Sequence, residues 1–364
     1  MRVAVLGVGL IGGSIGLAAR RRVGAEVVGF DPDAATLTRA VELGALDAGS
    51  DSLDEAVAGA DAVFCAAPVA ALPGLVADAI AASGPDALIT DVGSTKRGLL
   101  EAVEGLEGAA RFIGGHPLAG AETAGVAGSR EDLFEGARWF LCPMPASEGV
   151  LIDRLHRLIA GLGARPQAID AARHDGEMAT ISHLPHVLAN ALVSAAAGSL
   201  AGGERAPEVG RSFRDATRVA GANPEIWADI FSSNAEAVAT GIDAVSERLA
   251  AAAELIRSGD VEALAAWQDE AREDRRLMLE ADLAATPLLE LRVAVENRPG
   301  TVAEIALALA RAGVNIEDMS LFPASDQRTG AISLWIGGEG EAARAAEIVS
   351  GLGHTVAPIS AAES

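Results

Sequence analysis

Two short segments of the chain carry side chains that could move a proton. His116 lies in GGHPLAG and Ser94 lies in DVGSTK, each after a short apolar run. A histidine in such a loop can accept the proton of a substrate hydroxyl while hydride leaves the adjacent carbon. Ser94 could hydrogen-bond this histidine, whereas Lys96, at the expected start of a helix, is predicted to be solvated. The alternative for His116 is that it only caps its loop.

A second group of residues suits an anionic substrate. Arg214 and Arg218 are four residues apart in RSFRDATRVAGANPEIW, on one face of an expected helix. A guanidinium group can hold a carboxylate through two parallel hydrogen bonds. Asp215 lies beside them, so an ion-pair network within the helix is the alternative.

The histidines and cysteines show no metal-binding pattern. His183 and His186 are three residues apart, but Pro185 lies between them and no carboxylate or Cys completes a helical metal motif. Cys65 and Cys142 form neither a CxxC pair nor a disulfide framework, as is typical of a reducing cytoplasm. We therefore expect no metal and two buried free thiols.

The N-terminal segment has the spacing of a phosphate-binding turn. The sequence GVGLIG, which begins at Gly7, joins a short apolar strand to a helix. Gly7 permits a tight turn, Gly9 lets the backbone approach a pyrophosphate, and Gly12 allows the helix to pack closely on the strand. Backbone N–H groups at the helix start, at Leu10 and Ile11, would then face the phosphates.

The next strand-like run indicates which dinucleotide is bound. It ends at Asp31, 19 residues after Gly12, where an acidic residue accepts hydrogen bonds from the adenosine ribose and repels a 2′-phosphate. No Arg or Lys follows before Arg39, so the sequence predicts NAD rather than NADP. The alternative for Asp31 is a solvated turn. The glycines and the short apolar length argue against a signal peptide or membrane span, so we expect a cytoplasmic protein.

Composition narrows the class of partner. The 364 residues include 28 Lys and Arg against 51 Asp and Glu, for a formal charge of −23. An acidic surface disfavours binding to nucleic acid and to anionic membranes. An anionic substrate would therefore need arginines inside a cleft.

Three patterns follow one another along the chain. In residues 1–146 short apolar runs alternate with helical stretches, which predicts an α/β domain with a doubly wound, Rossmann-type sheet. Residues 147–282 are Ala-rich with helical periodicity, which predicts an all-helical substrate and dimerisation domain, and hence a homodimer. Residues 288–360 read β-α-β-β-α-β, the ferredoxin-like order.

Taken together, these motifs resemble a known family. GVGLIGGSIGLA, DVGSTK, GGHPLAGAETAG, HDGEMATISHLPH and FRDATRVAGANPEIWADIF closely resemble, in this order, the prephenate/arogenate dehydrogenases of tyrosine biosynthesis. This resemblance covers residues 1 to about 280. The segment ENRPGTVAEIALALARAGVNIEDMSL resembles an ACT domain, a ligand-binding module that many bacterial members of the family carry at the C-terminus.

The resemblance implies NAD-dependent oxidative decarboxylation of prephenate to 4-hydroxyphenylpyruvate, or of arogenate to tyrosine. It implies that His116 is the catalytic histidine, that Ser94 orients it, and that Arg218 binds a substrate carboxylate. Further matches fall on residues expected at the substrate: His186 and Trp227 near the site, His183 as support and Glu122 at the mouth of the cleft. Ala121 replaces a longer polar residue of several relatives, which leaves the choice between prephenate and arogenate open.

The ACT resemblance implies an effector site. Its ligand-side turn and strand start fall on Asn297, Pro299, Gly300, Asn315 and Ile316. The resemblance implies that tyrosine or a related amino acid binds there and lowers activity. The alternative is an ACT domain that only aids dimerisation.

Two other functions fit the sequence less well. A β-hydroxyacid dehydrogenase would need a catalytic lysine in the helical region, but residues 147–279 contain none. An NAD-sensing regulator with a working ACT domain would predict a degenerate active site. The candidate residues Ser94, His116, His186 and Arg218 are instead all present.

Overall fold

The computed structural model divides the chain into two compact parts, residues 1–248 and 249–364. It describes residues 1–120, 125–147, 149–199, 209–282, 288–296, 298, 300–312, 314–316, 318–323, 329–357 and 360–361. The candidate residues Glu122, Asn297 and Pro299 lie outside the described residues.

The N-terminal part is built on one sheet, which has eight strands among the described residues. These strands are β1 (Arg2–Leu6), β2 (Glu26–Phe30), β3 (Ala48–Ser50), β4 (Ala62–Cys65), β5 (Leu88–Asp91), β6 (Phe112–Pro117), β7 (Arg138–Pro143) and β8 (Arg165–Ala168). Their order is β3-β2-β1-β4-β5-β6-β7-β8, and the first six form the doubly wound arrangement predicted from the sequence. Strand β7 is antiparallel to β6, and β8 is parallel to β7.

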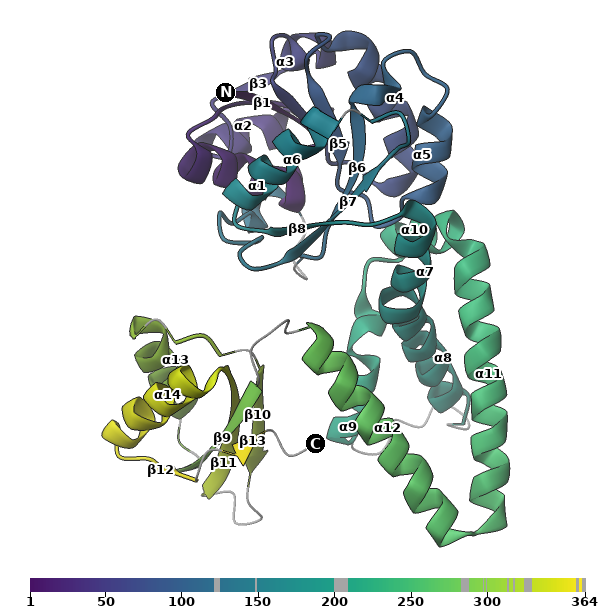
Figure 1. Ribbon diagram of the computed structural model, residues 1–364, viewed down its shortest axis with the longest axis vertical. Helices are drawn as coiled ribbons and strands as arrows, with labels where there is room; N and C mark the ends of the chain where they lie inside the picture. Colours follow the sequence, from purple (N-terminus) through teal and green to yellow (C-terminus); the bar gives the residue numbers. More distant parts are fainter. Residues whose placement is uncertain are drawn as a thin grey trace. The chain divides into compact units, whose positions relative to one another are not determined.

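Helices cover both faces of this sheet (Figure 1). They are α1 (Leu10–Ala18), α2 (Ala34–Glu42), α3 (Leu53–Val57), α4 (Leu72–Ala82), α5 (Arg97–Val103) and α6 (Gly149–Gly161). Alternate residues of β1 enter different cores: Val3 and Val5 pack with α1, α2 and α6, whereas Ala4 and Leu6 pack with α3, α4 and α5. Because both faces are covered, the strand is apolar at almost every position.

The sheet runs beyond residue 146, where the sequence pattern suggested the helical region begins. Helix α6 and strand β8 belong to the nucleotide-type fold, since β8 pairs with β7. Its sequence Arg-Pro-Gln-Ala has no apolar alternation, because β8 lies at the edge of the sheet and is largely exposed. Proline is tolerated on such an edge strand.

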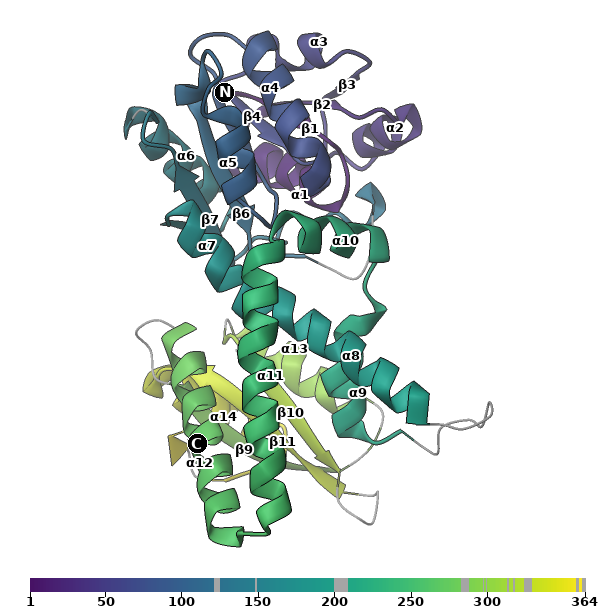
Figure 2. The same ribbon diagram turned by 90° about the vertical axis from the view of Figure 1, so that its right-hand side faces the viewer.

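Helices follow β8 in the remainder of the N-terminal part. They are α7 (Ala171–Met178), α8 (Leu184–Ser199), α9 (Arg211–Thr217), α10 (Pro224–Ser233) and α11 (Ala235–Ser258), of which α11 continues into the second part. Side-chain caps fix two of their starts: Asp170 accepts hydrogen bonds from the first turn of α7, and Asn223 does so for α10. Figure 2 shows α10 close to the end of the sheet, where it packs near the turn after β4.

The C-terminal part contains helix α12 (Val261–Asp282) and a small α/β fold. The elements of this fold are β9 (Leu288–Glu296), α13 (Thr301–Arg311), β10 (Asp318–Pro323), β11 (Thr329–Gly337), α14 (Glu339–Gly351), β12 (Thr355–Val356) and β13 (Ser360–Ala361). The antiparallel sheet has the order β10-β11-β9-β12, with β13 also paired to β9. The predicted β-α-β-β-α-β order is confirmed, and its core joins Leu291 and Val293 of β9 to Ile305 and Leu309 of α13.

No helix in the described stretches of the chain combines the length and apolar character needed to cross a membrane.

Candidate active site

The glycine turn after β1 has room for a ligand at one position and close backbone contacts at the others. Gly7 has φ +95°, and a Cβ there would lie 2.4 Å from the carbonyl oxygen of Ala66. A Cβ at Gly12 would lie 2.0 Å from the carbonyl oxygen of Gly7. At Gly9, by contrast, no atom of the described residues comes within 4 Å of the Cβ position. The turn is therefore shaped for packing at Gly7 and Gly12 and open at Gly9.

The start of α1 completes a cradle that fits a dinucleotide. Gly9 is the N-cap of α1 and supplies no side-chain cap, so the first-turn N–H groups of Leu10 and Ile11 remain available to a phosphate. Asp31 follows β2 directly, and its Oδ2 accepts a hydrogen bond from the backbone N of Val8 at 2.8 Å. A carboxylate has further lone pairs that can accept from a ribose hydroxyl.

His116 lies within β6 rather than in the loop after it, opposite Phe140 of β7. The preceding Gly115 lets β6 approach the end of β5. A Cβ on Gly115 would lie 2.4 Å from the carbonyl oxygen of Asp91, and the N–H of Gly115 donates to Asp91 Oδ1 at 2.9 Å. The glycine directly before His116 is thus required by the close approach of two strand ends.

Lys96 is fully buried and forms an ion pair with the equally buried Asp91. The expectation that Lys96 is solvated is therefore wrong. Asp91 Oδ2 also accepts a hydrogen bond from the N–H of Gly93 at 2.7 Å, so the same carboxylate stabilises the turn at the start of the DVGSTK loop. A buried lysine needs such a partner, because an uncompensated charge in the interior is strongly unfavourable.

The hydrogen-bond partner of His116 is another histidine. Nδ1 of His116 lies 2.9 Å from Nε2 of His174, and Nδ1 of His174 lies 2.8 Å from Oδ1 of Asp175. His174 is fully buried at the start of the helical region and packs edge-on against Phe140. These contacts link the strand that carries His116 to α7.

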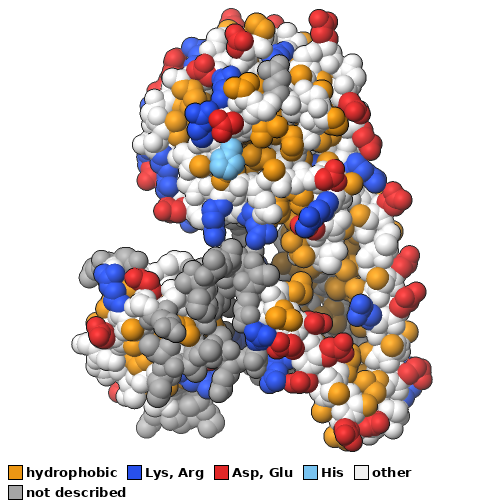
Figure 3. Space-filling view, viewed as in Figure 1, with side chains coloured by type: hydrophobic (Ala, Val, Ile, Leu, Met, Phe, Trp, Pro, Cys, Tyr) orange, Lys and Arg blue, Asp and Glu red, His pale blue; other side chains and the backbone are white. Residues whose placement is uncertain are grey.

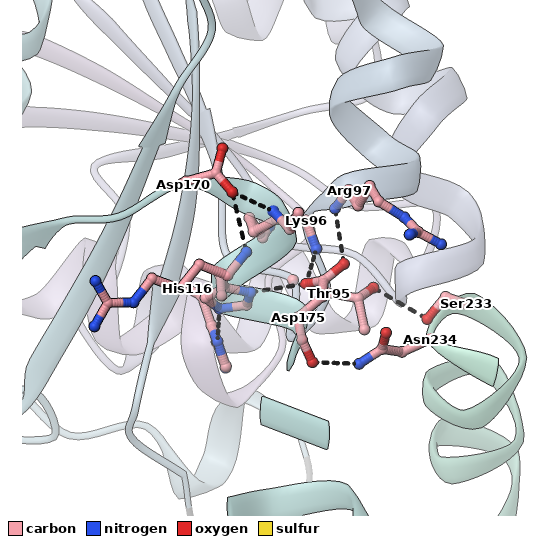
Figure 4. A network of polar contacts seen from close by, with 12 residues as sticks. Thr95, Lys96, Arg97, His116, Asp170, Asp175, Ser233 and Asn234 are labelled. Carbon is pink, nitrogen blue, oxygen red and sulfur yellow. Dashed lines mark hydrogen bonds and ion pairs between the residues drawn. The ribbon is translucent and has the colours of Figure 1, made fainter. Parts of the chain in front are cut away.

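Asp175 is the centre of a wider network (Figure 4). Its carboxylate accepts hydrogen bonds from the backbone N–H groups of Lys96 and Arg97 at 2.8 and 2.9 Å. Its backbone carbonyl accepts from Nδ2 of Asn234, between α10 and α11, at 2.8 Å. Asn234 Nδ2 also lies 3.3 Å from Nδ1 of His183. A single residue therefore joins the DVGSTK loop, α7 and the junction of α10 with α11.

The candidate substrate residues gather on the helical side of this network. The ring of His186 stacks on Trp227, with centroids 3.4 Å apart, and His183 meets the same indole edge-on at 6.0 Å. Arg218 lies near enough to His186 for its positive charge to lower the pKa of that imidazole, after burial as the larger cause. His183, His186, Arg218 and Trp227 are thus brought together.

The environment keeps the site histidines neutral. Burial, followed by electrostatic interactions with His174, Lys96 and His183, lowers the pKa of His116 well below its ordinary value. Burial is also the main cause that lowers the pKa of His183 to about 4. A neutral imidazole can accept a proton, so His116 is suited to act as a base.

Other candidate residues take different positions. Ser94 is half-buried in the DVGSTK loop and, within the described chain, makes no hydrogen bond to His116. Arg214 is exposed and lines a surface cavity of about 490 Å³ together with Arg211 and Asp215. The ion pair within α9 joins Arg211, not Arg214, to Asp215 at 3.6 Å.

The described effector candidates lie around α13. Gly300 has φ +95° immediately before this helix, and no described atom lies within 4 Å of its Cβ position. Asn315 is exposed, whereas Ile316 packs partly against the core of the small fold.

The sequence analysis assigned no role to His174, Asp175 or Asn234. One usable signal was present: the His-Asp pair precedes Met178 by about one helical turn, which places polar side chains on the buried face of α7. Asn234 carried no such signal, because it lies at a helix junction whose position depends on packing.

Comparison with known proteins bears on all three segments. Residues 15–167 match the nucleotide-binding domain of prephenate dehydrogenase, residues 170–270 match its dimerization domain, and residues 290–352 match the ACT domain. The prephenate dehydrogenase of Bacillus subtilis (strain 168) is 30% identical over 356 residues, which cover 95% of each chain. The chain belongs to the prephenate dehydrogenase family. It is accordingly an oxidoreductase.

Solved structures of the same family are also similar. The prephenate dehydrogenase of A. aeolicus, determined in complex with hydroxyphenyl propionate and NAD+, superposes with a TM-score of 0.70 at 30% identity and covers 76% of this chain and 98% of its own. The arogenate dehydrogenase of Synechocystis gives a TM-score of 0.65 at 29% identity, covering 76% of this chain and all of its own.

The buried ion pair offers a direct test of how the DVGSTK loop is held. Lys96→Met leaves the Asp91 carboxylate buried without its counter-charge and should lower the free energy of unfolding by about 3–5 kcal/mol, measured by urea denaturation. The matched control is Arg39→Met, which removes an exposed pair with Glu42 and should change stability by at most about 1 kcal/mol. Equal effects of the two substitutions would contradict the structural role of Lys96.

Proposed function

We propose that this protein is an NAD-dependent prephenate dehydrogenase, which oxidatively decarboxylates prephenate to 4-hydroxyphenylpyruvate. The observation that carries the proposal is His116: a neutral imidazole at the end of β6, backed by His174 and close to the cluster of His183, His186 and Trp227. Family membership supplies the reaction class, and the neutral state of His116 supports its assignment as the base that this reaction needs.

The cofactor is assigned to the cradle at α1. Gly7, Gly9 and Gly12, with the N–H groups of Leu10 and Ile11, would hold the pyrophosphate. Asp31 would accept hydrogen bonds from the adenosine ribose and disfavour a 2′-phosphate, which supports NAD over NADP. When bound, NAD+ supplies the acceptor for hydride. The similar A. aeolicus enzyme was determined with NAD+.

In the proposed reaction His116 accepts the proton of the C4 hydroxyl as hydride leaves C4. The ring carboxylate departs as CO2, and the electron pair of its C–C bond passes through the ring to the C4 oxygen. That oxygen, now a phenolate, takes the proton back from His116, so that no net proton is released. Ser94, which is half-buried in the DVGSTK loop, is assigned the role of orienting His116, as the family resemblance implies.

Substrate binding is assigned to the helical region. Arg218 would bind a substrate carboxylate, which its guanidinium can grip through two hydrogen bonds. His186 and Trp227 would line the site on the substrate side, with His183 supporting the indole from its edge. Glu122 is assigned to the cleft mouth from the sequence alone. The acidic surface makes these few positive groups selective for an anionic ligand that enters the cleft.

Arogenate is the second candidate substrate. It differs from prephenate by carrying an amino acid side chain in place of a keto acid, and its oxidation by the same steps would give tyrosine. The similarity to the Synechocystis arogenate dehydrogenase, at 29% identity, favours testing it beside prephenate.

We propose that the active form is a homodimer. Residues 190–195 of α8 are exposed on every side of the helix, including Leu192 and Val193, and Figure 3 shows further apolar side chains on the outer surfaces of α11 and α12. Exposed apolar faces of this kind are typical of protein–protein interfaces. We assign the interface to a second copy of the chain, because residues 170–270 match a dimerization domain. Sedimentation equilibrium should give twice the chain mass, and a monomer would contradict the proposal.

A side-by-side assay tests the function. NADH formation is followed spectrophotometrically with prephenate and with arogenate, and turnover of prephenate is expected. His116→Asn should lower kcat by about 10²–10⁴-fold, because it removes the base while preserving polarity. His156→Asn, at an exposed histidine of α6, is the matched control and should leave kcat unchanged. No turnover of either substrate by the wild type would refute the assignment.

The pH profile tests the state of His116. The base works only when unprotonated, and its pKa is lowered well below the ordinary 6.5. His116 therefore stays active as the pH falls through 6.5, and kcat/KM should decline only below that value. Initial rates of NADH formation at saturating NAD+ give this profile. A decline centred at or above 6.5 is the contrary outcome.

An amino acid effector is proposed for the ACT segment. Gly300, Asn315 and Ile316, with Asn297 and Pro299 assigned from the sequence, would form its ligand side. Tyrosine added to the full-length protein should lower the rate of NADH formation, with phenylalanine as the comparison. Absence of both inhibition and binding heat for either amino acid would instead favour an ACT domain that only aids dimerisation.

A further inference from the structure

We infer that His174 is a positioning residue that fixes the tautomer of His116, so that Nε2 is the nitrogen that accepts the substrate proton. The inference rests on the proposed role of His116 as the base. It goes beyond that role because it assigns a function to two residues, His174 and Asp175, that contact neither cofactor nor substrate in the proposed mechanism.

The argument begins at the Asp175 carboxylate. Oδ1 accepts a hydrogen bond from the backbone N–H of Lys96, and Oδ2 accepts one from that of Arg97. Burial alone would raise the pKa of Asp175, but hydrogen bonds from His174 and from these two N–H groups outweigh it and lower the pKa. The group is therefore an ionised carboxylate, which can only accept hydrogen bonds. It follows that Nδ1 of His174, 2.8 Å away, carries a hydrogen.

The hydrogen on Nδ1 of His174 determines which nitrogen of His116 carries a hydrogen. In a neutral imidazole one nitrogen is a donor and the other is an acceptor. With its hydrogen on Nδ1, His174 presents a lone pair at Nε2, and the group 2.9 Å away, Nδ1 of His116, must donate to it. The hydrogen of neutral His116 is thereby held on Nδ1. Its Nε2 keeps the lone pair that a base requires.

The opposite arrangement is unfavourable. For Nε2 of His174 to donate while Nδ1 keeps its hydrogen, this fully buried side chain would have to be an imidazolium; the Asp175 carboxylate would offset that charge, but it already accepts hydrogen bonds from two backbone N–H groups. That cation would stand close to His116, on which the positive charge of Lys96 already acts. It would also leave the hydrogen of His116 on Nε2, where it blocks proton acceptance.

The same contacts stabilise the product of proton transfer. When His116 takes the substrate proton on Nε2, its Nδ1–H continues to donate to His174, which is held in turn by Asp175. The ring orientation therefore stays constant through the step. Because Asp175 is fixed by the backbone N–H groups of Lys96 and Arg97, the orientation of the base is set by the docking of α7 on the end of the DVGSTK loop and the start of α5.

The tautomer can be measured without turnover. Full-length protein labelled with 15N-histidine, free of substrate, is examined by NMR at neutral pH, with the His116 signals assigned by their loss in His116→Asn. Nδ1 of His116 should be protonated and Nε2 unprotonated. A protonated Nε2 with an unprotonated Nδ1 would overturn the inference, even in an enzyme that oxidises prephenate.

Kinetics distinguish positioning from a merely structural role. His174→Phe keeps a ring against Phe140 but removes the acceptor. It should lower kcat by at least about tenfold, and by no more than the 10²–10⁴-fold loss expected on removal of a general base, with KM for NAD+ unchanged. His174→Gln offers an amide oxygen to Nδ1 of His116. Its kcat should therefore be close to that of the wild type and well above that of His174→Phe.

In the His116→Asn background, His174→Phe should cause no further loss of kcat, because His174 acts through His116. Equal losses in both backgrounds, or equal losses in the Phe and Gln variants, would overturn the inference. A wild-type enzyme that turns over neither prephenate nor arogenate would instead refute the proposed function. The NMR measurement would still decide which nitrogen of His116 carries the hydrogen.

Discussion

The site depends on one buried carboxylate. Asp175 accepts hydrogen bonds from the backbone N–H groups of Lys96, which ends the DVGSTK loop, and Arg97, which begins α5. It also accepts from the ring of His174, and its carbonyl accepts from Asn234. A buried charge without such partners would be strongly destabilising, so the loop, α7 and the start of α11 must dock together for any of them to be stable. The catalytic geometry is a consequence of this requirement.

A second buried carboxylate, that of Asp91, holds the segments on the sheet side of the site together. Asp91 holds Lys96, the N–H of Gly93 and the N–H of Gly115, and so ties the end of β5 to the strand that carries His116. Both carboxylates bind Lys96: Asp91 pairs with its side chain and Asp175 accepts from its backbone N–H. His116 is thus held by contacts from the sheet and from α7, while the low pKa that keeps it neutral follows mainly from burial, with the positive charge of Lys96 adding to it.

Much of the fold was predictable from local patterns. The glycine turn, the strand-helix alternation and the β-α-β-β-α-β order depend on spacing and periodicity within short segments, which is why they were recognised. Strand β8 was missed because an edge strand lacks the apolar alternation on which recognition depends. The position of Lys96 was misjudged for a related reason: a lysine at a helix start is usually solvated, and only the distant fold of the loop encloses it.

The sequence by itself determined the glycine turn, the order of the three segments and the choice of His116 as the candidate base, because each is encoded in residues close together along the chain. Only the tertiary structure decided what holds that histidine. His116 and His174 are 58 residues apart, and the Lys96 N–H that meets Asp175 is 79 residues from it. Contacts of that range leave no periodic signature; they arise when separately folded segments pack and every buried polar group must find a partner.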